Sequence, residues 1–124
     1  MNVFIEGSCY TRKQISRRLG GGTQDFLPHS RKHVVCGCFK RKFNPNAPKE
    51  ILPGKTDNKQ RWAQQFYEQG EAVPIFVKQT RNHWEYVGLW RCLNLDSDIK
   101  RVKAANRRAG RTDVAMILTL EKTR

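Results

Sequence analysis

The feature that most constrains the fold is a pair of apolar runs separated by a short polar connection. Residues 73–79 and 83–93 are rich in Val, Ile, Phe, Trp and Tyr, and Thr80-Arg81-Asn82 joins them. This pattern is typical of an antiparallel β-hairpin, which we predict at the centre of the fold. Side chains two apart in a strand share a face. The second run therefore places on one face Trp84, Tyr86, Gly88, Trp90 and Cys92, and on the other Val87, Leu89 and Leu93.

Around the hairpin, capping residues and glycine stops predict three helices. These begin at Thr11, at Asp57 or Asn58, and at Asp96 or Ser97, and they end near Leu19, Gln69 and Ala109. Further strands are predicted at 3–5, 33–39 and 114–120. The order predicts one α+β domain over residues 1–124, with a mixed, largely antiparallel sheet or small barrel and about three helices.

Charge limits the classes of partner. The chain has 24 Lys and Arg against 11 Asp and Glu, a formal net charge of +13, and the excess is concentrated toward its two ends. Such a field attracts polyanions, of which nucleic acid is the commonest. No apolar run reaches the roughly 18 residues of a membrane span, and the N-terminus lacks a signal-peptide pattern. We therefore expect a cytoplasmic protein with no membrane partner.

The candidate phosphate contacts are basic residues that cluster in three places: the first helix, the segment after the 33–39 strand, and the third helix. Replacing Arg17 and Arg18 together is expected to weaken binding to every sequence and to flatten its salt dependence. The alternative for each residue is a solvated surface charge. The candidates are Arg12, Arg17, Arg18, Lys40, Arg41, Lys42, Arg101, Arg107 and Arg108.

Aromatic side chains on the hairpin could receive a base. The rings of Trp84, Tyr86 and Trp90 could stack on it, with Tyr10 and Phe26 on a second wall, and Gln24 and Asp25 in a glycine-rich loop could bond to its edge. The alternatives are that a row of rings on one strand face forms core, and that the loop only ends a helix. The loop lacks the Lys-Ser/Thr ending of a P-loop, which argues against nucleotide hydrolysis.

Metal and redox chemistry find little support in the sequence. Cys36-Gly37-Cys38 places two thiols on one strand face, but no CxxC pair or Cys/His spacing indicates zinc. Four cysteines without a secretion signal are typical of reduced thiols packed in a core. We predict no metal, no cofactor and no enzymatic activity, although a small metal-dependent nuclease stays an alternative.

Several motifs resemble a prokaryotic domain found beside nucleases in restriction-like proteins. They are Tyr10-Thr11-Arg12-Lys13-Gln14-Ile15, Leu19-Gly20-Gly21, Phe26-Leu27-Pro28, Asn44-Pro45-Asn46-Ala47-Pro48, Ile51-Leu52-Pro53-Gly54, Val73-Pro74-Ile75-Phe76-Val77-Lys78 and Trp84-Glu85-Tyr86-Val87-Gly88. Such domains are similar to the PUA, EVE and SRA-like group of small mixed barrels. The resemblance implies recognition of a modified or flipped base, with a separate nuclease as a partner.

These observations together favour a nucleic-acid-binding domain. We expect DNA in preference to RNA, with a basic surface on the backbone and an aromatic-lined site for a modified or flipped base. A PUA-type RNA-binding module shares the same pattern, and competition between matched DNA and RNA would separate the two. A purely structural interaction protein would bind neither at physiological salt.

Overall fold

The predicted hairpin forms the centre of the structure. The computed structural model describes residues 3–123, in which β6 (Val73–Thr80) and β7 (His83–Asp96) pair antiparallel. The turn between them includes Asn82 with a positive φ of 57°, a conformation that Asn tolerates better than most residues. The hairpin prediction is confirmed.

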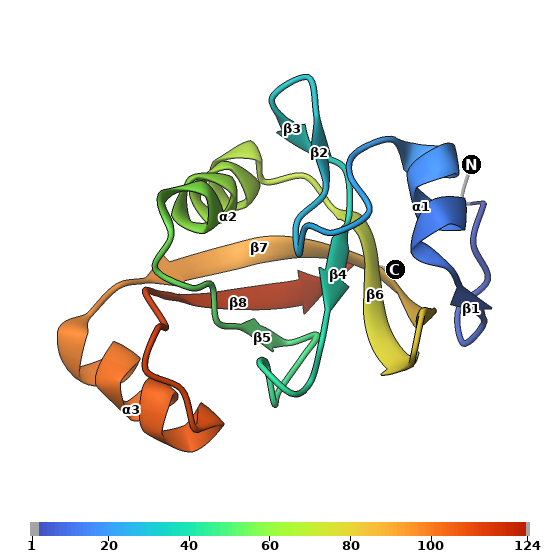
Figure 1. Cartoon of the computed structure of the whole chain (residues 1–124). Coiled ribbons are helices and arrows are strands. Elements are labelled where there is room, and N and C mark those ends of the chain that lie inside the picture. The colour runs from blue at the N-terminus through green and yellow to red at the C-terminus, as the bar shows by residue number, and fades with distance from the viewer. Residues whose placement is uncertain (1–2, 124) are drawn as a thin grey trace.

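The main sheet is mixed and mostly antiparallel (Figure 1). Its order is β4-β6-β7-β8-β5, formed by β4 (Gly37–Phe39), the hairpin, β8 (Ile117–Lys122) and β5 (Glu50–Ile51). The short β1 (Cys9–Tyr10) pairs with the start of β7, and among the strands that the structure describes only the β4–β6 pair is parallel. The predicted α+β class is confirmed. The prediction left open a sheet or a small barrel. The described strands form an open sheet and do not close into a barrel.

Three helices surround this sheet, as predicted. They are α1 (Arg12–Leu19), α2 (Asp57–Gln69) and α3 (Ile99–Ala109). Thr11 and Gln14 form a capping box at α1, because each side chain bonds the backbone N–H of the other. The caps of α2 and α3 are Thr56 and Asp98, each one residue away from a predicted position. None of the helices within residues 3–123 is long and apolar enough to cross a membrane.

A separate two-stranded hairpin lies between α1 and β4. It consists of β2 (His29–Ser30) and β3 (His33–Val34), and in Figure 1 it projects from the body at the top of the view. The predicted strand over 33–39 is therefore two strands, β3 and β4. The predicted strand over 3–5 is absent, because this segment is a loop that buries only Phe4.

Strand β7 reverses its faces at Gly88. Pairing runs from Phe76↔Tyr86 to Pro74↔Leu89, so β7 has one residue more than β6 over this interval, and Gly88 has a φ of 107°. This is a β-bulge, and an extra residue moves all following side chains to the opposite face. The predicted common face of Trp84, Tyr86 and Trp90 is therefore wrong.

The reversal divides the apolar side chains of β7 between two cores. Trp84 and Tyr86 join Phe76, Cys36 and Ile15 on the side of α1. Beyond the bulge, Trp90 and Cys92 join the main core with residues of α2, β6 and β8. A third, smaller cluster holds α3 through Ala105, whereas Ile99 at the start of this helix is 71% exposed.

The bulge gives a test of the fold. Gly88→Ala is expected to lower the free energy of unfolding by about 1–3 kcal/mol, because a φ of 107° is strained for any residue with a Cβ. Urea denaturation measures the loss. Gly70→Asn is a control, since its φ of 65° suits Asn and a Cβ there meets no atom within 4 Å. Equal stability of Gly88→Ala and wild type would contradict the assignment.

Candidate nucleic-acid interface

Three cavities with shared walls form one continuous depression at the β4 edge of the sheet. A central cavity of about 280 Å³ lies between the loop at 24–27, β4, the start of α2 and Trp84. An outer cavity of about 610 Å³ shares Arg12 and Trp84 with it and extends to the β6–β7 turn. A side cavity of about 200 Å³ shares Phe26 and Phe43 with it and extends to Arg111. We call the three together the basic groove.

Positive charge dominates this groove. Its walls include seven cations and two carboxylates, and one of the carboxylates, Asp113, is paired with Arg111. Walls of one sign focus the field and raise the local concentration of an anionic ligand. The seven cations are Arg12, Lys13, Lys40, Lys59, Lys78, Arg81 and Arg111.

Four aromatic side chains line the central cavity, namely Phe26, Phe43, Trp62 and Trp84. Trp62 stacks on His29 with ring centroids 3.6 Å apart, and its indole N–H donates to Asn58 Oδ1 at 3.2 Å. The Phe26 carbonyl accepts from the backbone N–H of Cys38 at 2.9 Å. These contacts hold the walls in place before any ligand arrives, which lowers the entropic cost of binding.

Phe43 is the exposed ring of the set. It is 42% exposed and forms a wall between the central and side cavities. Three cations lie near its ring, with Lys42 Nζ 5.6 Å, Lys40 Nζ 5.9 Å and Arg111 Cζ 5.9 Å from the centroid. An open ring among cations is suited to stacking on a base while the cations contact its phosphates.

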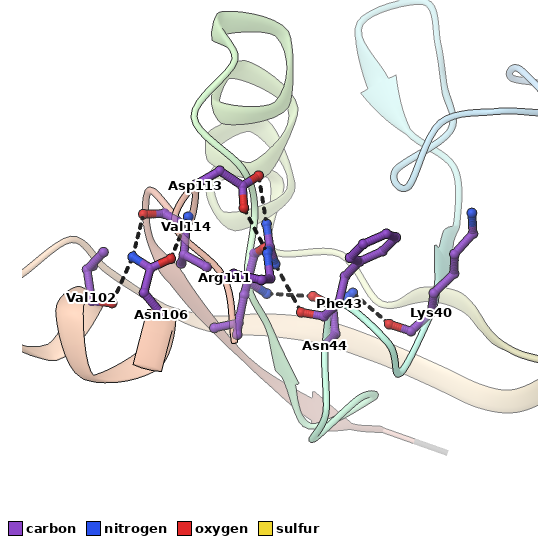
Figure 2. Close-up of polar contacts among 9 residues, drawn as sticks. Lys40, Phe43, Asn44, Val102, Asn106, Arg111, Asp113 and Val114 are labelled. Carbon is purple, nitrogen blue, oxygen red and sulfur yellow. Dashed lines mark hydrogen bonds and ion pairs between the residues drawn. The ribbon is translucent and has the colours of Figure 1, made fainter. Parts of the chain in front are cut away.

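Arg111 fixes the segment that carries Phe43 (Figure 2). Its guanidinium donates to the carbonyls of Phe43 at 3.0 Å and Leu52 at 2.7 Å, and it forms a two-point ion pair with Asp113. Asn44 closes the same turn, since its amide donates to the Lys40 carbonyl and accepts from the Leu52 N–H. Arg111 is thus a structural clamp at the groove, and its side chain is only 11% exposed.

Two buried N–H groups at the central cavity lack a partner. Among the side chains of residues 3–123, Nε of Arg12 and Nε1 of Trp84 are buried without a hydrogen bond. Arg12 and Trp84 are 9% and 4% exposed, both line the central and outer cavities, and the Arg12 guanidinium lies 5.1 Å from the Trp84 ring centroid. A buried donor without a partner costs about 1–3 kcal/mol.

Six residues predicted from sequence line the groove: Arg12, Gln24, Asp25, Phe26, Lys40 and Trp84. Arg12 is predicted to contact phosphate, but its side chain is buried and bonds the protein's own backbone. Its guanidinium donates to the carbonyl of Asp25 at 2.8 Å and to that of Gly22 at 3.4 Å, which ties the glycine-rich loop to α1. Arg41 and Lys42 are exposed in the turn that leads to Phe43.

Other predicted residues lie away from these cavities. Tyr86 and Trp90, predicted to stack on a base, are core side chains at 1% and 7% exposure, and Trp90 already donates to the Val87 carbonyl. Tyr10 packs against Phe4 and Phe76, with its hydroxyl accepting from the Ile5 N–H. The alternative that rings of the hairpin strand form core holds for Tyr86 and Trp90, although they belong to two different cores.

The other predicted cations of α1, and those of α3, lie outside the groove walls. On α1, Arg18 lies over the Phe4 and Tyr10 rings, while Arg17 is exposed. On α3, Arg101 pairs with Asp96, and Arg108 pairs with Glu50. Arg107 is exposed near the end of that helix. The role of these residues in binding stays a prediction.

Sequence reasoning missed much of the groove wall. Lys59, Lys78, Arg81 and Arg111 are isolated in the chain and converge only through the fold. Trp62, on α2, is not among the base contacts predicted from the sequence. Phe43 could have been found, because it directly follows Lys40-Arg41-Lys42 and a ring next to a basic run is a nucleic-acid signal.

The cysteines are free thiols. Cys36, Cys38 and Cys92 are buried, as predicted, while Cys9 is exposed. A hydrogen bond with Cys38, together with burial, raises the pKa of the Cys36 thiol, and burial raises the pKa of Cys92 to about 12. In the part of the chain that the structure describes, no three His, Cys, Asp or Glu side chains form a group suited to a metal ion.

Comparison with solved structures defines the fold as SRA-like. The crystal structure of the SUVH5 SRA domain in complex with hemi-methylated CG DNA matches with a TM-score of 0.58 over 98% of this chain and 90% of that one. At 8% identity the likeness establishes the fold. Residues 9–102 match the model of DUF6697, a domain of unknown function, and the chain belongs to this family. No curated protein matches it.

The ion pair of the clamp predicts a pH-dependent effect. The hydrogen bond that Arg111 donates to Asp113 lowers the pKa of this carboxyl group below its ordinary value of 3.8. A carboxylate with a lowered pKa stabilises the fold above its ordinary pKa, and this contribution is lost as the pH falls through the lowered value. Asp113→Asn is therefore expected to destabilise the protein at neutral pH and to match wild type in strong acid, as measured by urea denaturation.

A double-mutant cycle identifies the source of the effect. In an Arg111→Met background, Asp113→Asn should have little further effect at neutral pH, because its partner is gone. An equal difference between Asp113→Asn and wild type at every pH would contradict the role of the charge.

Proposed function

We propose that this protein is a DNA reader that accepts one base in its central cavity while the basic groove holds the adjoining backbone. The observation that carries the proposal is an aromatic-lined cavity at the centre of a cationic groove, whose walls include two side chains, Arg12 and Trp84, with buried and unpartnered N–H donors. A cavity of this kind favours a flat, anionic ligand with hydrogen-bond acceptors on its edge.

The cations supply the part of the affinity that is independent of sequence. Each phosphate neutralised by Lys or Arg releases a counterion. The logarithm of the affinity therefore falls linearly with the logarithm of the salt concentration. Lys13, Lys78 and Arg81 line the outer cavity, and Lys40 lies between it and the central cavity. We infer that the backbone on either side of the bound base follows this line of charges.

The polar groups of the cavity favour a cytosine-type base. The N–H groups of Arg12 and Trp84 are donors and require acceptors such as a ring carbonyl or ring nitrogen. Asp25 supplies a carboxylate at the same cavity, which can accept from an exocyclic amino group, as carboxylates do from cytosine N4. Cytosine combines both acceptors with an amino group, and Phe26 and Phe43 offer faces for its ring.

The structural neighbour supports DNA, and a modified base, as the target. That SRA domain was crystallised with hemi-methylated CG DNA. We extend this to a modified cytosine in DNA, flipped out of the stack, as the ligand of the present cavity. The protein would act as a binding module, and a separate nuclease, which the sequence resemblance implied, would be its partner.

Loss of groove cations tests the backbone contact. Lys78→Gln with Arg81→Gln is expected to weaken binding to every DNA sequence and to lower the slope of log affinity against log salt by about two. Fluorescence anisotropy at several salt concentrations measures both. Lys100→Gln with Lys103→Gln removes the same charge from exposed positions of α3 and should leave the slope nearly unchanged. If the two double variants gave equal slopes, the outer cavity would not be part of the DNA interface.

Removal of one donor tests the base contact. Trp84→Phe keeps a ring but deletes the unpaired N–H, and it is expected to weaken binding to the preferred modified duplex about tenfold, the equivalent of one hydrogen bond of ~1.4 kcal/mol. Binding to plain duplex should change less, because it depends on the groove cations.

The matched control is Trp90→Phe. Trp90 is equally buried on the same strand, but its N–H is bonded to Val87 and it lies outside the cavity. It should therefore lose stability without losing discrimination between modified and plain DNA. If Trp84→Phe retains full discrimination, or if both variants lose it alike, the central cavity is not the site that reads the base.

A further inference from the structure

A second groove, with no aromatic side chain among its described wall residues, runs along α3. Its volume is about 500 Å³, and it lies between α3, the start of α2 and the segment before β8. None of its described wall residues belongs to the three cavities of the basic groove. In Figure 1 α3 lies at the lower left, across the molecule from α1 and the β6–β7 turn. We call this depression the α3 groove.

Helix α3 presents one stripe of side chains to this groove. Ile99, Val102, Lys103 and Asn106 line it together, because positions i, i+3, i+4 and i+7 of a helix share a face. Val and Ala at 114–115 add apolar surface across from the helix. Ile99 is 71% exposed and Val102 is half-buried, so apolar surface stays open to solvent here. A partner with apolar side chains can cover this surface.

Asn106 holds the two walls of the α3 groove together (Figure 2). Its amide N–H groups donate to the carbonyls of Val102 at 3.3 Å and Val114 at 3.4 Å, and its oxygen accepts from the Val114 N–H at 3.0 Å. The N–H of Ala115 donates to the Pro53 carbonyl at 2.9 Å. The groove is therefore formed before any ligand arrives, which reduces the ordering that binding requires.

Positive charge predominates at the α3 groove. Its described wall residues include two cations, Lys55 and Lys103, and no carboxylate. The helix itself, Ile99–Ala109, has five cations and no acidic residue. Two of the five are in ion pairs with residues outside the helix. Within residues 3–123 no ion pair neutralises the other three, which are Lys100, Lys103 and Arg107.

We propose that the α3 groove binds an acidic amphipathic segment of a partner protein. Its large apolar side chains, such as Leu or Phe, would cover Ile99 and Val102, and its carboxylates would pair with Lys100 and Lys103. A nucleic acid fits less well, because the groove offers no ring for base stacking and Ile99 cannot bond a phosphate. This inference goes beyond the proposed DNA binding, since the two surfaces share no described wall residue.

A synthetic peptide tests the chemistry of the groove. The probe is a fluorescein-labelled amphipathic helix with Leu along one stripe and Glu elsewhere. Its controls are a scrambled peptide of the same composition, which has no stripe, and a version with Gln in place of Glu. Fluorescence anisotropy with the full chain should show the tightest binding for the first peptide, weakened by salt. Equal binding of the acidic and scrambled peptides, or no binding of either, would overturn the proposal.

Loss of the exposed apolar side chain locates the peptide. Ile99→Ser is expected to weaken its binding about tenfold, as the loss of one apolar anchor does. Leu93→Ser is the matched control, because Leu93 is 50% exposed on β7, outside the α3 groove, and it should keep the affinity of wild type. Both positions are exposed, so both variants should fold, which circular dichroism checks. If the two variants bound the peptide equally well, the α3 groove would not be its site.

Two charge variants separate the α3 groove from the DNA interface. Lys100→Gln with Lys103→Gln should weaken peptide binding and leave duplex DNA binding nearly unchanged, whereas Lys78→Gln with Arg81→Gln should do the reverse. Each pair removes the same charge. If the α3 pair lost DNA binding and kept peptide binding, α3 would be a nucleic-acid surface and the proposal would be wrong. Failure of wild type to bind any DNA would contradict only the proposed function.

Discussion

The face reversal of β7 at Gly88 is the constraint on which the rest of the structure depends. Before the bulge, Trp84 and Tyr86 pack toward α1, and after it Trp90 packs toward α2. One strand thus supplies both cores, and the remaining strands and helices assemble around it. Trp84 lines the central cavity, whereas Tyr86 on the same face is buried against Phe76, and the reversal turns Trp90 to the other core. A regular strand would have placed all three on one face.

Two buried arginines hold the loops that form the walls of the groove. Arg12 holds the glycine-rich loop by its carbonyls, and Arg111 holds the turn that carries Phe43 (Figure 2). Both guanidiniums are largely buried, so each serves two purposes: it satisfies backbone acceptors and it adds positive charge to the groove. The aromatic walls are consequently rigid, which is the property that a selective binding site for one base requires.

The sequence predicted the fold class, the central hairpin and the three helices, because each depends on local periodicity, caps and glycine stops. It could not predict the groove in full, since Lys78 and Arg111 are far apart in the chain and come to line two cavities of the same groove only in the folded protein. The error at β7 has a specific cause: strict alternation was assumed through Gly88, and a bulge is not visible in alternation. Phe43, by contrast, carried a local signal in the basic residues before it.

The most direct test of the central claim uses the unmodified protein. Its affinity would be measured for one duplex, plain and carrying modified cytosine, at low and physiological salt, with matched single-stranded DNA and RNA as competitors. A reader with a base-specific cavity binds one modified duplex more tightly, and the preference persists at higher salt because hydrogen bonds and stacking provide it. Uniform binding that salt abolishes, or stronger competition by RNA, would contradict the account.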